Sequence, residues 1–163
     1  MTVLKTSRNK WVILLMPAVI FGLIHLQNPN VTVFSIANLV LGGVAFAYLM
    51  LKTGRIWASI GLHITWNFFL GNVFGIAVSG TENFSVMTTE LQGKKWLTGG
   101  AFGIEGGAIF TLLLVLLLVF IHLFVKNPDG SGWSSESDMP LFIQTMPYTI
   151  FRRNFSLDII NIV

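Results

Sequence analysis

The chain has 163 residues, of which 53% are hydrophobic and only 10% are charged, and its formal net charge is +3. Soluble domains have about 25% charged residues, so this chain has too few charges to cover its surface in water, and we expect an integral membrane protein surrounded by a lipid bilayer. Ten Lys and Arg residues are too few for a nucleic-acid-binding protein, and the absence of Cys excludes disulfides, thiolate metal sites and a Cys nucleophile.

Four apolar segments follow one another along the chain. The hydrocarbon core of a bilayer is about 30 Å thick and requires roughly 20 apolar residues in a helix. Inside lipid, backbone polar groups are satisfied only when such a segment is helical. We therefore predict an all-α, polytopic transmembrane helix bundle of four spans within a domain of residues 9–125, the spans being residues 11–26, 31–51, 56–78 and 104–125.

Basic residues indicate the orientation of these spans. Lys and Arg gather on the cytoplasmic side of membrane proteins. Placing the N-terminus inside puts every basic cluster inside except Lys94 and Lys95, so we expect both termini in the cytoplasm of a prokaryote with the chain in its plasma membrane. The clusters placed inside are Lys5, Arg8 and Lys10, then Lys52 and Arg55, then Lys126.

The two ends of the chain lead to two further expectations. The first apolar run is followed by no small-residue cleavage site, so we expect a retained span rather than a signal peptide. Residues 126–163 begin polar and turn-rich and end apolar but interrupted by Pro147 and two Arg residues. They are expected to form a cytoplasmic tail, with the membrane surface as a candidate location for its apolar end.

Three polar side chains interrupt the apolar spans in a regular way. The first span contains Phe21 and His25, and the third contains His63 and Asn67. Spacing of four residues places each pair on one face of its helix, so we expect both imidazoles to face a shared interior. Without helix tilt the two imidazoles would lie about 12 Å apart along the membrane normal.

The spacing leaves several functions open for these residues. An imidazole orients water, accepts a proton or binds a metal, and a carboxamide stabilises a developing oxyanion. The same residues also serve as hydrogen-bonding contacts between membrane helices, worth about 0.6 kcal/mol each. Axial ligation of a haem by the two histidines is a third reading, which a Soret band would reveal. His122, one turn before Lys126, is interpreted as an interfacial residue.

Two motifs in order resemble those of a known family. "FGLIH" at residues 21–25 with its flanks, followed by "GLHITWNF", resembles the FxxxH and HxxxN motifs of the CAAX protease and bacteriocin-processing (CPBP) family of intramembrane endopeptidases, also called type II CAAX prenyl endopeptidases. The resemblance extends over roughly residues 9–125. It implies that His25 helps to activate water and that His63 and Asn67 bind or polarise the scissile carbonyl.

The resemblance also implies partners and cofactors. The substrate would be a membrane-associated or prenylated peptide. A divalent metal such as Zn is a candidate cofactor, with His25 and His63 as candidate ligands. The residues leave open whether a metal or a glutamate-activated water is used, and the oligomeric state is not indicated.

The sequence departs from the family pattern at one point. The family's EExxxR motif precedes FxxxH, and this sequence contains no such motif. We therefore expect a truncated enzyme that is proteolytically inactive or nearly so, or a non-catalytic relative with a binding or bacteriocin-immunity-like role. Glu105 is the one candidate replacement for the missing carboxylate. Its position also suits a simpler interpretation, a carboxylate in the first turn of the fourth span that is stabilised by the helix dipole.

Overall fold

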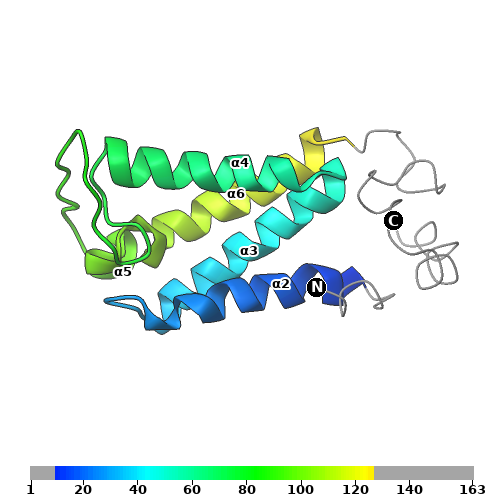
Figure 1. Cartoon of the computed structure of the whole chain (residues 1–163). Helices are drawn as coiled ribbons and strands as arrows, with labels where there is room; N and C mark the ends of the chain where they lie inside the picture. Colours follow the sequence, from blue (N-terminus) through cyan, green and yellow to red (C-terminus); the bar gives the residue numbers. More distant parts are fainter. Residues whose placement is uncertain (1–9, 127–163) are drawn as a thin grey trace, which may run out of the picture.

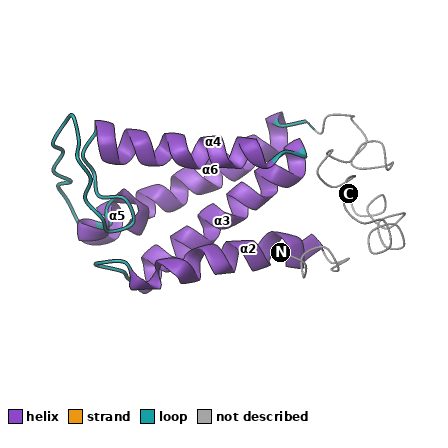
Figure 2. Ribbon diagram, viewed as in Figure 1, coloured by secondary structure: helices purple, strands orange, loops and turns teal. Residues whose placement is uncertain are grey.

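The computed structural model describes residues 10–126, and within that range it is all-helical (Figures 1 and 2). Four long helices form an elongated bundle, and short helical turns connect them at one end. In chain order the longer elements are α2 (Lys10–Ile24), α3 (Val33–Thr53), α4 (Ile56–Asn67) and α6 (Ala108–Phe124). The all-α prediction is therefore confirmed for the described residues, and the tail from residue 127 onward lies outside them.

Helix α3 is the centre of the bundle and crosses between its neighbours (Figure 1). It contacts α2 on one side and α4 and α6 on the other. Local sequence sets both of its ends. Thr32 and Ser35 form a reciprocal capping box at the start, with bonds of 3.0 and 2.8 Å between side chain and backbone. Gly54 adopts the left-handed conformation that ends the helix, with a φ of 64°.

Small residues allow α2 and α3 to approach closely. A Cβ atom added at Gly43 would lie 2.7 Å from the Cα of Ala18, so only glycine fits at this crossing. Ala18 is fully buried there. This is the close backbone approach that small residues permit between membrane helices.

The third apolar segment changes its helical form immediately after Asn67. Helix α4 (Ile56–Asn67) continues as a π-helical turn, Phe68–Val73, and the predicted span to residue 78 therefore ends earlier than expected. π-helical turns inside α-helices occur frequently at functional sites. The chain then forms a loop with one isolated bridge, between Val78 and Thr81.

The fourth apolar segment also differs from the prediction. Helix α6 begins at Ala108, not at residue 104, and it is preceded by a short helix, α5 (Lys95–Thr98), and by two 3-10 turns, Gly100–Phe102 and Ile104–Gly106. Gly107, which lies between Glu105 and α6, has extended backbone angles (φ −115°, ψ 164°) that an α-helix cannot contain. Glu105 therefore lies in the 3-10 turn before α6, and its placement in the first turn of that helix was wrong.

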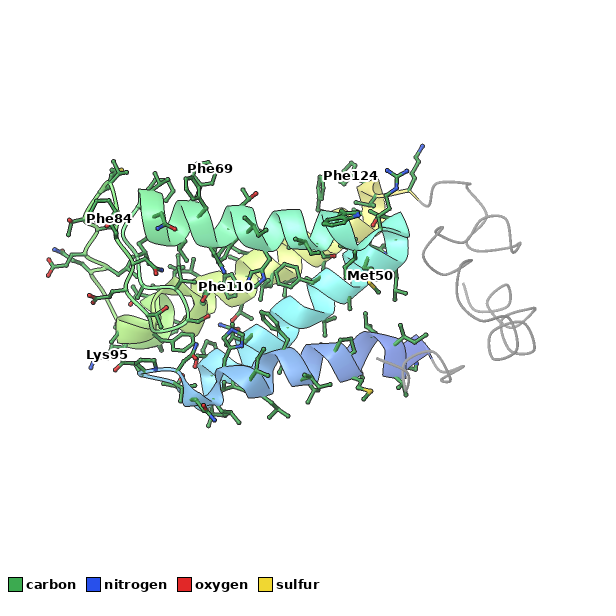
Figure 3. All side chains as sticks on the ribbon, viewed as in Figure 1. Met50, Phe69, Phe84, Lys95, Phe110 and Phe124 are labelled. Carbon is green, nitrogen blue, oxygen red and sulfur yellow. The ribbon has the colours of Figure 1, made fainter. Side chains whose placement is uncertain are left out.

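One end of the bundle collects most of the basic positions of the described residues. Helix α2 begins at this end, α3 turns into α4 here through Lys52 and Arg55, and α6 ends here before Lys126 (Figure 1). The long loop and Lys95 lie at the opposite end (Figure 3). The orientation was predicted on the assumption that these basic positions lie together on one side of the membrane, and in the structure they lie together at one end of the bundle.

The apolar character of the helices extends to their outer faces. On α6 the side chains of Leu112, Leu116 and Phe120 are each more than half exposed. Within the described range, one helix is long and apolar enough to cross a membrane by itself, α3 (Val33–Thr53). The apolar helices Trp11–Gln27 and Ala108–Phe124 are shorter, so length and composition leave four spans unconfirmed.

Candidate functional site

His25 lies at the junction of α2 and the following 3-10 turn, His25–Gln27. Its Nδ1–H donates a hydrogen bond of 2.6 Å to the carbonyl oxygen of Phe21, one turn earlier. The Phe21 ring also packs against the imidazole, with 4.8 Å between the ring centroids. These contacts fix the tautomer of His25 and leave Nε2 as the nitrogen with a free lone pair.

His63 and Asn67 form a second pair, one turn apart on α4. The Nδ2 of Asn67 lies 3.1 Å from the Nε2 of His63 and donates to it when that nitrogen is unprotonated. The Oδ1 of Asn67 is buried and has no hydrogen-bond partner among the described residues. Buried polar groups are normally paired, so this oxygen identifies a position where a ligand atom would be stabilised.

A cluster of three rings connects the two pairs. Phe21, Phe46 and His63 contact one another, with centroid distances of 5.4 Å from Phe21 to His63, 5.1 Å from Phe46 to His63 and 5.9 Å between the two Phe rings. Phe21 therefore touches both His25 and His63. The two motifs therefore meet at the ring of Phe21, although α2 and α4 lie on different sides of α3.

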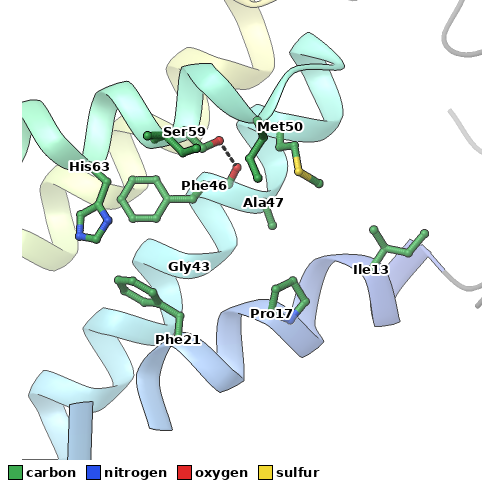
Figure 4. Close-up of a pocket in the computed structure, with 11 residues that line it drawn as sticks. Ile13, Pro17, Phe21, Gly43, Phe46, Ala47, Met50, Ser59 and His63 are labelled. Carbon is green, nitrogen blue, oxygen red and sulfur yellow. Dashed lines mark hydrogen bonds between the residues drawn. The ribbon is translucent and has the colours of Figure 1, made fainter. Parts of the chain in front are cut away.

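An apolar cavity of about 330 Å³ opens beside this ring cluster (Figure 4). It lies between α2, α3 and α4, and His63 is at one end of it. Ser59, whose hydroxyl donates 2.7 Å to the carbonyl of Phe46, adds a second polar group that is already satisfied. His25 is not among the residues that line the cavity, which are Ile13, Pro17, Phe21, Gly43, Phe46, Ala47, Met50, Ile56, Ser59, Ile60 and His63.

Glu105 is buried on the other side of the ring cluster, at 4% exposure. Its Oε1 accepts a hydrogen bond of 2.8 Å from the indole N–H of Trp66, and its Oε2 accepts two of 2.7 Å from the backbone N–H and the hydroxyl of Ser79. All three donors are neutral. Trp66 is three residues after His63, so the carboxylate is attached to the helix face that carries the histidine.

Helix α3 holds the backbone at Glu105 and just after it. The Nδ2 of Asn38 donates to the carbonyl oxygens of Glu105 and Gly107, at 2.8 and 3.0 Å. The hydroxyl of Thr111 donates to the Oδ1 of Asn38 at 2.7 Å, so the carboxamide is fully engaged. This buried network fixes the turn before α6 against the central helix.

A second, smaller cavity of about 30 Å³ lies between Glu105 and the ring cluster. Its polar lining consists of His63, Ser79 and Glu105. Phe21, Phe46 and His63 line both cavities, so the three rings form the wall between them. The remaining lining residues are Leu39, Gly42, Phe110 and Leu114.

The site offers few ligands for a metal ion. A catalytic zinc normally has three protein ligands. Among residues 10–126 no group of three or more His, Cys, Asp or Glu side chains is arranged to hold a metal ion. The described residues therefore do not fit a zinc centre at His25 and His63.

His122 lies away from this site, near the end of α6. It is exposed, and its Nδ1 is 2.9 Å from the hydroxyl of Tyr48 on α3. It thus contributes to the contact between α3 and α6 at the end of the bundle that carries Lys52 and Lys126.

Sequence reasoning singled out His25, His63 and Asn67 but undervalued Glu105. The sequence already marked Glu105 as a candidate, because it is the one acidic residue in the apolar segment of residues 104–125. Trp66 and Ser79 were missed, because nothing in the sequence marks them as functional. Their role follows only from their hydrogen bonds to Glu105 in the folded chain.

Over its described residues the chain is an apolar, all-helical bundle. Two of its helices bring two histidines and a carboxamide to one ring cluster, beside an apolar cavity. Residues 1–69 match the model of a protein family described as type II CAAX prenyl endopeptidase Rce1-like. The match confirms the resemblance inferred from the two motifs within residues 1–69, which include His25, His63 and Asn67 but not Glu105. No curated protein matches the chain, and no solved structure does.

Proposed function

We propose that this chain carries a hydrolytic site of the CAAX prenyl endopeptidase kind, which acts on peptides held in a membrane by a prenyl group or an apolar segment. The observation that carries the proposal is the meeting of the FxxxH and HxxxN motifs at Phe21, beside the apolar cavity. The family match over residues 1–69 supports the same activity.

The apolar cavity suits the membrane-bound part of such a substrate. A volume of about 330 Å³ falls within the range of small-molecule binding pockets. With an apolar group in the cavity, the adjacent peptide bond would lie near His63 at its end, and Asn67 is one turn further along α4, bonded to His63. The cavity therefore supports substrates whose apolar chain is close to the bond that is cleaved.

The chemistry proposed is addition of water to the scissile carbonyl. An imidazole, His25 or His63, takes a proton from the water as its oxygen bonds to the carbonyl carbon, and it returns the proton to the leaving nitrogen when the C–N bond breaks. The Asn67 carboxamide can turn so that its oxygen accepts from a protonated His63 Nε2. Its NH₂ group would then donate to the oxyanion.

The membrane arrangement proposed has four spans, with both termini in the cytoplasm of a prokaryote. Helix α3 has the length to span alone. Helix α2 with its following 3-10 turn, α4 with its π turn, and α6 would complete the set, because their exposed apolar side chains need lipid around them. The basic positions at one end of the bundle support this orientation.

A second candidate function is peptide binding without cleavage, including a bacteriocin-immunity-like role. It is favoured by one observation, the buried Oδ1 of Asn67, which has no hydrogen-bond partner among the described residues and would accept a hydrogen bond from a bound peptide. The same cavity and the same Asn67 would then bind a peptide that stays intact.

The deciding experiment uses the purified chain in lipid vesicles with a fluorogenic farnesylated peptide and with the same peptide carrying no lipid. We expect cleavage of the farnesylated peptide that His63→Ala abolishes, and a raised KM in Ala47→Phe, which fills the apolar cavity. Ala37→Phe, at an exposed position of α3, is the matched control. Saturable binding without cleavage, weakened by Ala47→Phe, would favour the second candidate, and neither binding nor cleavage would reject both.

A further inference from the structure

We propose that one water molecule in the small cavity joins the Glu105 carboxylate to the His63 imidazole, so that Glu105 is the positioning carboxylate of this site. The role in catalysis rests on the proposed function, whereas the water-mediated contact does not.

The cavity has the size and the polar lining that a single water requires. A buried water needs about 10–15 Å³ of accessible volume and two to four polar partners. The cavity offers about 30 Å³ and three polar lining residues, His63, Ser79 and Glu105. The rest of its lining is apolar, so a water there would be directed towards these three groups.

Glu105 retains the capacity to accept a hydrogen bond from that water. A carboxylate has about four acceptor positions. The bonds from Trp66 and Ser79 occupy three of them, one on Oε1 and two on Oε2. The remaining position on Oε1 belongs to a side chain that is buried and lines the cavity.

His63 lines both cavities, so it can meet the water on one side and the substrate on the other. The imidazole becomes positively charged when it takes a proton from the attacking water. A carboxylate joined to it through one bound water would orient the ring and stabilise that charge, as buried carboxylates do for catalytic histidines. Glu105 acts through His63 and does not touch the substrate, because the ring cluster lies between them.

This arrangement supplies the carboxylate that the sequence motifs lack. The expectation of an inactive chain rested on the absence of a carboxylate near the histidines. Glu105 comes from a segment about forty residues beyond the second motif, outside the residues matched by the family model.

Two substitutions test the contact, each in a different way. Glu105→Gln keeps the size of the side chain but replaces one acceptor oxygen with an NH₂ group. Gly42→Ala adds a methyl group at the lining of the cavity, where its nearest neighbour would be the Cδ2 of Leu114 at an ordinary 3.9 Å, and so it takes up room needed by the water. Gly61→Ala is the matched control, because it is also a glycine within a helix and its added Cβ meets nothing within 4 Å.

The measurement is NMR of the full chain in lipid nanodiscs with ¹⁵N-labelled histidine, and His63→Gln identifies the signal of His63 among the three histidines. We expect a cross-peak between the His63 ring and a long-lived water, present in Gly61→Ala and lost in Gly42→Ala. We also expect Glu105→Gln to shift the ring nitrogen signals of His63. Absence of the water cross-peak, or His63 signals that are the same in Glu105→Gln as in the parent chain, would overturn the proposal.

Kinetics separate this inference from the proposed function. With the farnesylated peptide, Glu105→Gln and Gly42→Ala should lower kcat by about 10²-fold with little change in KM, whereas Gly61→Ala should leave both unchanged. Cleavage that survives both substitutions rejects the role of Glu105 and leaves the proposed function standing. A chain that cleaves nothing but shows the water and the His63 shift rejects the function and retains the contact. If Glu105→Gln fails to fold, Gly42→Ala decides both measurements.

Discussion

The indole N–H of Trp66 donates a 2.8 Å hydrogen bond to the Oε1 of Glu105, and this contact attaches a buried carboxylate to the helix that carries His63 and Asn67. It joins residues 39 positions apart in the chain. Through it, the turn before α6 becomes part of a site that otherwise consists of α2, α3 and α4.

Removing this donor should destabilise the fold. Trp66→Phe leaves the Glu105 carboxylate buried with one bond fewer, and hydrogen bonds to charged groups are worth about 1.5–3 kcal/mol. We expect a lower midpoint of thermal unfolding in detergent, followed by circular dichroism. Trp57→Phe is the control, because Trp57 lies on the same helix and is 75% exposed. Equal midpoints for the two variants would show that the hydrogen bond adds nothing to stability.

Asn67 should be needed for turnover more than for folding. Its Oδ1 has no partner among the described residues, so Asn67→Ala removes a group that the folded chain alone does not fully use. If the carboxamide stabilises the oxyanion, kcat should fall by about 10²–10³-fold. The assay is the cleavage of the farnesylated peptide. Asn72→Ala is the control, since the Asn72 side chain is exposed and donates to the carbonyl of Phe84 in the loop. A loss confined to KM would assign Asn67 to binding instead.

The crossing of α2 and α3 should tolerate no side chain at Gly43. Gly43→Ala would place a Cβ atom 2.7 Å from the Cα of Ala18, and relief of such overpacking costs about 1–3 kcal/mol. Gly61→Ala should instead be neutral or stabilising, because alanine favours a helix over glycine by about 1 kcal/mol and the space around Gly61 is open. Denaturation of both variants under the same conditions tests the contrast. Greater stability for Gly43→Ala would mean that the two helices are further apart than described.

The orientation in the membrane can be tested with single cysteines, because the natural chain has none. Thr53→Cys lies at the end of α3 beside Lys52, and Asn83→Cys lies in the exposed loop at the other end. A membrane-impermeant maleimide added to intact cells should label the cysteine at position 83 and not the one at position 53. The opposite pattern would reverse the topology, and labelling of both would contradict a bundle that spans the membrane.

Several features of the site could be predicted from the sequence. The three polar residues lie where helical spacing placed them, with Asn67 one turn from His63 and bonded to it. The sequence could not provide the exact limits of the fourth helix. The apolar segment begins at residue 104, yet Ile104–Gly106 forms a 3-10 turn and Gly107 is extended, so α6 begins only at Ala108. Glu105 was consequently placed in a helix that begins after it.

The sequence by itself determined that the chain is apolar and helical, where its long helices approximately lie, and which residues form the two polar pairs. Each of these depends on composition or on spacing within one or two helical turns. The tertiary structure alone decided that Phe21 touches both histidines, that an apolar cavity ends at His63, and that Trp66 and Ser79 bind Glu105. The contacts to Glu105 join residues 39 and 26 positions apart. They depend on how the helices pack against α3, and no periodicity within a single helix encodes a distance between two of them.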